Sequence, residues 1–172
     1  MEVAIMLEKI KLEDLSINPF TLIGKEWMLI SAGTEQKYNM MTASWGALGV
    51  FWGKNVASVY IRPQRYTLEF VNEQEYYALN FFEDSHKKAL AYCGAHSGRD
   101  VDKTKESRLT PAFDAKAPYF QEAKLVLICR KLHRQLLDPA GFIDPTLDGQ
   151  WYPEKDYHNI FQGEIVEVLQ KK

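Results

Sequence analysis

The segment Ser97-Gly98-Arg99-Asp100-Val101-Asp102-Lys103 carries the most specific pattern in this chain of 172 residues. It combines a small hydroxyl side chain, a turn-forming glycine and two cations over a short distance. Arg and Lys neutralise phosphate groups, while hydroxyls and backbone N–H groups hydrogen-bond to phosphate oxygens. If Asp100 begins a helix, Arg99 and Lys103 lie one turn apart on a shared face. The segment therefore predicts a site for an anionic, hydroxyl-rich ligand.

Two further segments show a similar mixture, Asn39-Met40-Met41-Thr42-Ala43-Ser44-Trp45 and Arg62-Pro63-Gln64-Arg65-Tyr66-Thr67. Thr42 and Ser44 are two positions apart, so on a strand their hydroxyls face the same side. Thr67 is expected to cap a helix, whose free N–H groups and positive dipole end favour phosphate. One fold could bring the three segments together, and a nucleotide-like ligand is the natural expectation.

In this order and at these separations, the three segments resemble the flavin reductase-like family, the FMN-binding split barrels that include the flavoredoxins. The resemblance is best over Trp27 to Leu109 and continues more weakly to Gly163-Glu164-Ile165-Val166. It implies a six-stranded Greek-key β-barrel with added helices, usually a homodimer, with FMN near the subunit interface. Arg108 stands where the family pattern often has Gly, which could alter a helix end there without removing a cofactor contact.

The resemblance also implies which residues hold the cofactor. Ser97 and Lys103 are expected at the phosphate, and Asn39, Met40 and Met41 are expected to line the ring. Trp45 is expected in the core or an interface rather than on the flavin. The full set of expected cofactor-binding residues is Asn39, Met40, Met41, Thr42, Ser44, Arg62, Arg65, Tyr66, Thr67, Asn80, Ser97, Gly98, Arg99 and Lys103.

His158 is the one candidate catalytic residue, because it resembles a His that lies beside the flavin in family relatives. It could orient a nicotinamide or stabilise charge on reduced flavin, and a structural His at the start of a strand is an equal alternative. The other three histidines, His86, His96 and His133, have no metal-ligand spacing, and no metal site is expected.

Each candidate group also has a purely structural interpretation. Thr42 and Ser44 could lie on a solvated strand face, and Arg62 and Arg65 could be solvated on a turn. The charges of the 97–103 segment could form a surface ladder, which contributes little. Asn80 is equally well interpreted as a satisfied buried amide.

Composition limits the function classes. The chain is 46% hydrophobic and 26% charged, typical of a soluble globular domain, and its formal net charge is −2. That charge provides no general attraction for nucleic acid or an anionic membrane, so neither is an expected partner. Cys93 and Cys129 are not in a Cys-x-x-Cys motif and are expected to be buried free thiols, which favours a reducing, cytoplasmic location. No signal peptide and no membrane span are expected.

The chain contains no Gly-x-Gly-x-x-Gly motif after a strand and no phosphate-binding P-loop. A nicotinamide nucleotide would therefore bind transiently in a groove rather than in its usual domain, while the flavin remains bound.

The pattern of strands and turns predicts one domain. Residues 1–20 are expected to form an extended N-terminal arm, and residues 21–172 a single split-barrel domain. Strands are expected over 26–32, 42–52, 56–61, 76–82, 123–137 and 158–169, with a hairpin turn at Gly53-Lys54-Asn55. Helices are expected over 66–72 and 85–92, the second capped by Ser85. The chain is therefore expected to be mainly β with short helices.

The function expected from the resemblance is an FMN-binding oxidoreductase of flavin reductase type, which passes hydride from NADH or NADPH to flavin. The protein would align the two rings and tune their charge, because the cofactor carries the redox chemistry. Two alternatives remain: an electron carrier of flavoredoxin type that serves a redox protein partner, and a flavin-binding protein without turnover.

Overall fold

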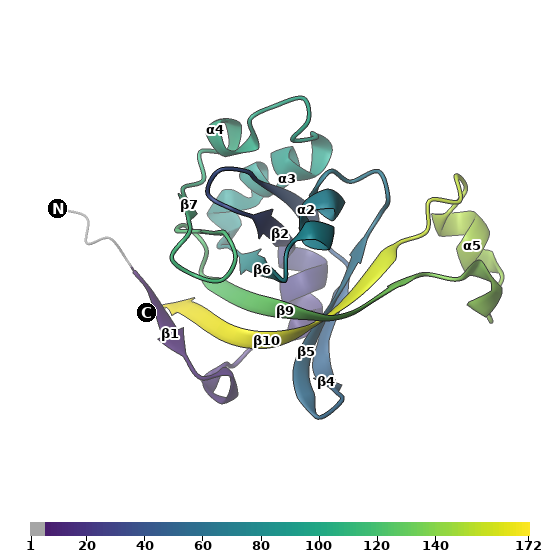
Figure 1. Ribbon diagram of the computed structural model, residues 1–172, viewed down its shortest axis with the longest axis horizontal. Coiled ribbons are helices and arrows are strands. Elements are labelled where there is room, and N and C mark those ends of the chain that lie inside the picture. The colour runs from purple at the N-terminus through teal and green to yellow at the C-terminus, as the bar shows by residue number, and fades with distance from the viewer. Residues whose placement is uncertain (1–5) are drawn as a thin grey trace.

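The computed structural model describes residues 6–172, and an antiparallel sheet of eight strands dominates it (Figure 1). The strand order is β3-β2-β6-β9-β10-β5-β4, with β1 paired to β10. The strands are β1 (Leu7–Ile10), β2 (Met28–Gly33), β3 (Tyr38–Ala43), β4 (Gly46–Phe51), β5 (Lys54–Ile61), β6 (Tyr76–Phe81), β9 (Leu125–Leu136) and β10 (Asn159–Lys171). The fold class expected from the sequence, mainly β with short helices, is confirmed. The sheet has two strands more than the six that the resemblance implied.

A tight hairpin joins β4 to β5. Phe51 pairs with Lys54, so only Trp52 and Gly53 form the loop. Both have positive φ, 52° and 67°, which is the backbone of a two-residue turn that follows the twist of the strands. The predicted hairpin is therefore confirmed, with its turn one residue earlier than the Gly53-Lys54-Asn55 segment.

The strand β9 divides two apolar cores because its side chains alternate between the faces of the sheet. Leu125, Leu127 and Cys129 belong to one core, and Val126 and Ile128 belong to the other. Beyond Cys129 the side chains of β9 become partly or fully exposed. The long curved ribbon of β9 and β10 thus leaves the body of the domain at the end where α5 (Thr146–Trp151) lies (Figure 1).

The helices α2 (Thr67–Glu73), α3 (Lys87–Ala95) and α4 (Lys103–Ser107) lie above the β9–β10 ribbon in Figure 1, and the β4–β5 hairpin extends below it. The remaining short elements are the helices and turns α1 (Pro19–Thr21), η1 (Leu12–Asp14), η2 (Leu22–Glu26), η3 (Asp84–His86) and η4 (Pro139–Gly141), and the small ladder of β7 (Pro111–Ala112) with β8 (Tyr119–Phe120).

Three local predictions about helix starts are wrong. Ser85 does not cap a helix, because α3 begins after His86 and has no side-chain cap. Thr67 is the first residue of α2 rather than its cap. Asp102, not Asp100, starts the helix near Lys103, where its carboxylate accepts the N–H of Lys105 at 3.0 Å. Short polar residues compete for such cap positions, so the sequence alone could not choose among them.

The N-terminal segment expected as an extended arm contributes strand β1, whose residues Leu7 to Ile10 pair with Lys171 to Val168. Both predicted free cysteines are buried and unbridged. No helix within residues 6–172 is long and apolar enough to cross a membrane.

Candidate functional site

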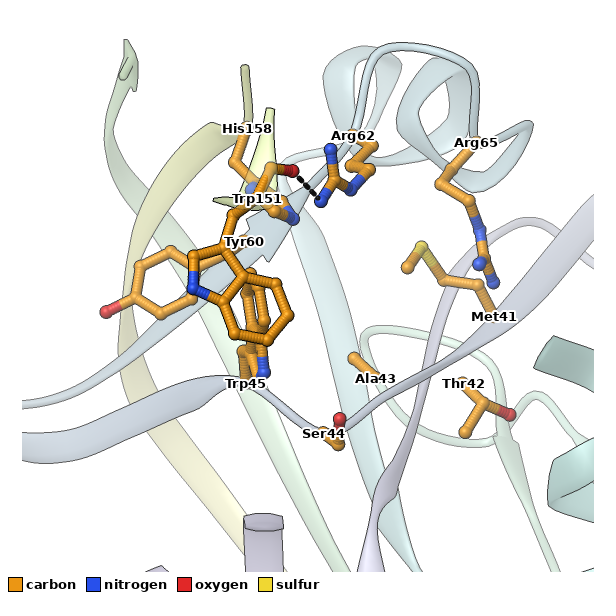
Figure 2. A pocket seen from close by; sticks show the side chains of 10 residues that line it. All are labelled: Met41, Thr42, Ala43, Ser44, Trp45, Tyr60, Arg62, Arg65, Trp151 and His158. Atoms are coloured by element: carbon orange, nitrogen blue, oxygen red, sulfur yellow. Dashed lines mark hydrogen bonds between the residues drawn. The ribbon is translucent and has the colours of Figure 1, made fainter. Parts of the chain in front are cut away.

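The site lies at the short connection between the two outermost strands of the sheet. The strand β3 ends at Ala43 and β4 begins at Gly46, so Ser44 and Trp45 connect the outermost strands of the hydrogen-bonded order. A cavity of about 220 Å³ opens at this seam (Figure 2). Its lining residues are Met41, Thr42, Ala43, Ser44, Trp45, Tyr60, Arg62, Arg65, Trp151 and His158.

Aromatic side chains form one wall of the cavity. Trp45 and Trp151 meet edge to face with ring centroids 5.0 Å apart, and Trp45 lies 5.4 Å from the ring of His158 (Figure 2). Tyr60 packs against His158 at 6.4 Å. Trp45 and Trp151 remain 39% and 43% exposed, so their ring faces are available for contact with a planar ligand.

His158 is held as a neutral imidazole at the top of this wall. It is buried, and its Nδ1 lies 2.6 Å from the hydroxyl of Tyr152. Burial, and then the nearby charge of Arg62, lower the pKa of His158 to about 4. At neutral pH the side chain therefore offers hydrogen-bonding groups without a charge.

The guanidinium of Arg65 lies on the other side of the cavity, and one of its nitrogens lacks a hydrogen-bond partner within residues 6–172 (Figure 2). Its Nη1 donates to the carbonyl of Gly94 at 3.4 Å, while its Nη2 is buried and has no hydrogen-bond partner. Within residues 6–172 only one other buried side-chain polar atom lacks a partner, the hydroxyl of Tyr77. Burial lowers the pKa of Arg65. An unpaired buried guanidinium is costly, and an anionic or oxygen-rich ligand would remove that cost.

The guanidinium of Arg62, by contrast, already has partners within the protein. It forms an ion pair with Asp156 at 2.8 Å, donates to the carbonyl of Trp151 at 2.9 Å and lies 4.9 Å from the ring of Tyr152. These three contacts all belong to the connection between β9 and β10. Arg62 therefore holds that connection over the cavity, a role that the sequence pattern did not predict.

A second group of predicted residues lies around the start of α2 and α4. Asn39 donates through Nδ2 to the hydroxyl of Thr67 at 2.9 Å, and both residues are buried. Gly98 packs so closely on this amide that a Cβ at position 98 would overlap the Asn39 oxygen. A hollow of about 320 Å³ is lined here by Tyr66, Gly98 and Lys103 among others.

Lys103 is buried in this group and anchors two elements. Its ammonium donates to the carbonyls of Met40 and Cys93, each at 2.8 Å. Burial lowers its pKa to about 8, and the neighbouring Arg65 contributes in the same direction. Two of its three N–H groups are thus used inside the protein, leaving one for a ligand.

Arg99 and Ser97 do not share a helix face with Lys103, because α4 begins only at Lys103. The guanidinium of Arg99 pairs with Glu69 and lies 4.4 Å from the ring of Tyr66. The hydroxyl of Ser97 accepts the backbone N–H of Arg99 at 3.2 Å. The predicted shared helix face of Arg99 and Lys103 is therefore wrong, although Arg99 still reaches Tyr66, which lines the same hollow as Lys103.

Two other predicted residues have internal partners. Asn80 is fully buried, donates to the Leu29 carbonyl and Ser31 hydroxyl, and accepts the Phe120 N–H. It is a satisfied buried amide and lines neither cavity. Thr42 lines the main cavity and donates its hydroxyl to the Leu90 carbonyl at 2.6 Å.

Sequence reasoning missed three contributors to the site. Trp45 was expected in the core or an interface, and it lines the cavity. Tyr60 was part of a strand expected to be buried, and Trp151 lies in a connection without a motif. The spacing of Trp151 and His158 on either side of a proline-containing turn gave no periodic signal, so only the fold joins them.

A split antiparallel barrel with a cavity lined by aromatic and arginine side chains at the β3–β4 connection is the class of protein that these features define. The profile of the family described as flavin reductase like domain matches residues 21–172. The chain therefore belongs to the flavin reductase-like family.

Solved structures show the same fold. The FMN-binding domain of a flavin reductases-like enzyme from Shewanella baltica aligns with a TM-score of 0.69 at 15% identity, over 96% of this chain and 77% of the other. Flavoredoxin from Methanosarcina acetivorans aligns with a TM-score of 0.67 at 24% identity, over 96% and 76%. Flavoredoxin of Desulfovibrio vulgaris aligns with a TM-score of 0.63 at 19% identity, over 94% and 75%. No curated protein matches the chain.

Proposed function

We propose that this protein binds FMN at the cavity lined by β3, the β3–β4 connection, the end of β5 and the β9–β10 connection, and passes hydride from NADH or NADPH to the flavin. The observation that carries the proposal is the buried, unpartnered Nη2 of Arg65 opposite a wall of aromatic rings. A planar ring with oxygen and nitrogen acceptors at its edge would pack on the rings and accept a hydrogen bond from the guanidinium.

The chain offers distinct groups for the parts of such a ligand. Arg65 and Ser44 line the main cavity, where Ser44 is exposed and its hydroxyl has no hydrogen-bond partner within residues 6–172. Lys103 keeps one N–H in the neighbouring hollow, and Tyr66 and Gly98 line the same space. These groups would hold the ring and the phosphate of FMN, respectively. When bound, FMN supplies the hydride and electron chemistry that these side chains cannot perform.

The remaining residues would shape the environment of that chemistry. Trp45 and Trp151 would pack on a planar ligand and so reduce its contact with water, and the positive charge of Arg65 in a desolvated wall favours an electron-rich ligand. His158 is neutral at physiological pH, so it would act through a hydrogen bond rather than as an acid. A structurally similar protein supports the ligand: it is an FMN-binding protein from Thermus thermophilus with bound p-hydroxybenzaldehyde.

Three measurements test the proposal. The absorbance spectrum of the purified protein reports bound flavin, and a fluorescence titration of the flavin-free protein gives the FMN affinity. Steady-state oxidation of NADH and NADPH with added FMN then reports turnover. We expect saturable FMN binding and oxidation of at least one donor. Absence of FMN binding would refute the proposal. Tight FMN binding without oxidation of either donor would replace it with a carrier of flavoredoxin type.

We also propose a homodimer in the cytoplasm. The main cavity is smaller than the usual ~300–1,000 Å³ of small-molecule sites, which is consistent with a second copy completing it. Large exposed side chains lie on the β4–β5 hairpin and the β9–β10 connection; they are Val50, Phe51, Trp52, Leu136, Ile143 and Trp151. Two buried free thiols fit a reducing compartment. The mass in solution tests the dimer, and a monomer with full FMN affinity would contradict it.

A further inference from the structure

Tyr152 makes a contact with His158 that the proposed chemistry does not itself require. Its hydroxyl lies 2.6 Å from the imidazole Nδ1, and both side chains are buried, at 6% and 7% exposure. Tyr152 does not line the main cavity, whereas His158 does. The tyrosine therefore contacts the outer side of the ring, away from the ligand space.

Both partners are fixed in place by their surroundings. The backbone of Tyr152 donates to the Asp148 carbonyl at 2.8 Å and accepts the Lys155 N–H at 3.0 Å. Its ring packs at 5.0 Å against Tyr157, and Arg62 lies over it. The backbone carbonyl of His158 accepts the N–H of Leu137 at 2.9 Å, which fixes the backbone of His158 beside the residue that follows β9. The geometry of the pair is therefore set by the β9–β10 connection as a whole.

The position of the shared proton follows from counting donors. Within residues 6–172, the Tyr152 hydroxyl has no hydrogen-bond partner other than His158. If Nδ1–H donated to the phenol oxygen, the phenolic proton would be left without an acceptor in a buried site. If the phenol donates to Nδ1 instead, the phenolic proton has an acceptor and the Nδ1 lone pair has a donor. The charged groups that face the imidazole are Arg62 and Asp156. Burial, and then the charge of Arg62, keep the ring neutral, while the carboxylate of Asp156 acts more weakly in the opposite direction.

We infer that Tyr152 is a positioning residue that fixes His158 as the tautomer protonated on Nε2, so the cavity receives a neutral N–H donor. A ligand placed against His158 must then offer a hydrogen-bond acceptor, such as a carbonyl oxygen or an unprotonated ring nitrogen. This role at the ligand rests on the proposed function, whereas the position of the proton is a property of the ligand-free chain.

The test is a long-range ¹H–¹⁵N correlation spectrum of the histidine rings in the full ligand-free chain at pH 7.5. His158 is assigned by the signals that disappear in His158→Gln. We expect a protonated, pyrrole-type Nε2 and an unprotonated, pyridine-type Nδ1. A pyrrole-type Nδ1 in the unmodified protein would overturn the inference, and that result does not depend on any variant being folded.

Tyr152→Phe removes the donor while keeping the ring, and Tyr157→Phe is the matched control because its hydroxyl bonds to Asp148 instead. We expect the His158 pattern to move toward a mixture of tautomers in Tyr152→Phe alone, with FMN affinity about threefold to tenfold weaker. An unchanged ring pattern in folded Tyr152→Phe would refute the positioning role. If the unmodified protein fails to bind FMN but shows the expected tautomer, the proposed function fails and this inference stands.

Discussion

The Arg62 guanidinium lies 2.8 Å from the Asp156 carboxylate and thereby joins the end of β5 to the connection between β9 and β10. Gln64 donates to the same carboxylate at 2.7 Å. The pair matters because the connection carries Trp151 and His158 to the cavity. An arginine predicted from the sequence as a cofactor ligand thus has a structural partner within the protein itself.

Asp156→Asn should loosen this connection without unfolding the domain. The variant loses the ion pair but keeps an acceptor for Gln64, and both charged side chains are about one-fifth exposed. We expect only a small fall in the free energy of unfolding, because ion pairs between partly exposed side chains contribute little to stability. Amide hydrogen exchange in residues 146–157 should become severalfold faster, as measured by mass spectrometry. Glu154→Gln, an exposed change in the same segment, is the control, and equal exchange in both variants would contradict the role of the ion pair.

Arg65→Met should separate ligand binding from stability. The unpartnered Nη2 makes no contribution to the folded state that compensates for its burial. We therefore expect the flavin-free variant to be as stable as the unmodified protein or more stable in urea unfolding. Its FMN affinity should fall by about 1–3 kcal/mol, the value of a charge-assisted hydrogen bond. Arg108→Met, at an exposed arginine, should leave the FMN affinity unchanged, and an unaltered affinity in Arg65→Met would exclude Arg65 from the site.

Lys103→Met should destabilise the protein itself. The change leaves the Met40 and Cys93 carbonyls without their donor in a buried site. We expect a loss of about 2–4 kcal/mol in the free energy of unfolding. Lys105→Met, on the exposed side of the same helix, should cost far less. If chemical denaturation gives equal stability for the two variants, the anchoring role of Lys103 is wrong. FMN affinity of Lys103→Met is meaningful only after correction for the folded fraction.

Stability should depend on pH through His158. Its pKa is about 4 in the folded state and 6.5 when exposed, so the unfolded chain binds the extra proton between these values. The stabilisation associated with the neutral ring is complete above pH 6.5 and is lost as the pH falls toward 4. At about 1.4 kcal/mol for each pH unit, the loss is about 3 kcal/mol.

His158→Gln removes this titration and leaves the other acid-sensitive groups, Asp156 among them, in place. Urea unfolding of both proteins at pH 7.5, 5.5 and 4.5 gives the comparison. The stability difference between the unmodified protein and the variant should shrink steadily toward low pH. A constant difference across this range would show that the imidazole does not titrate as described.

Several features could be predicted from the sequence because they depend on local alternation and on neighbouring residues. The alternation of Leu125 to Ile128 gave the strand that separates the two cores. The observed Trp52-Gly53 turn lies one residue from the turn segment that the pattern marked, and the burial of Cys93 and Cys129 followed from their residue type. The family resemblance was carried by three short segments, and the family match over residues 21–172 agrees with it.

The site could be predicted only in part. Arg65 and Ser44 line the cavity as expected, but Asn80 is satisfied internally and Arg99 pairs with Glu69. Polar side chains of these types serve equally well as ligands or as internal partners. Which role each one takes depends on the atoms that surround it, and those atoms come from distant segments.

By itself the sequence determined the alternating strands, the hairpin, the buried thiols and the family, because each is encoded in residues close together along the chain. Only the tertiary structure decided that Arg62 binds Asp156, that Lys103 anchors Met40 and that Tyr152 meets His158. Two of these contacts join residues more than sixty positions apart. The third depends on how one connection folds back over the sheet. Such contacts form where packing brings side chains together, and packing is a property of the whole core rather than of any one segment.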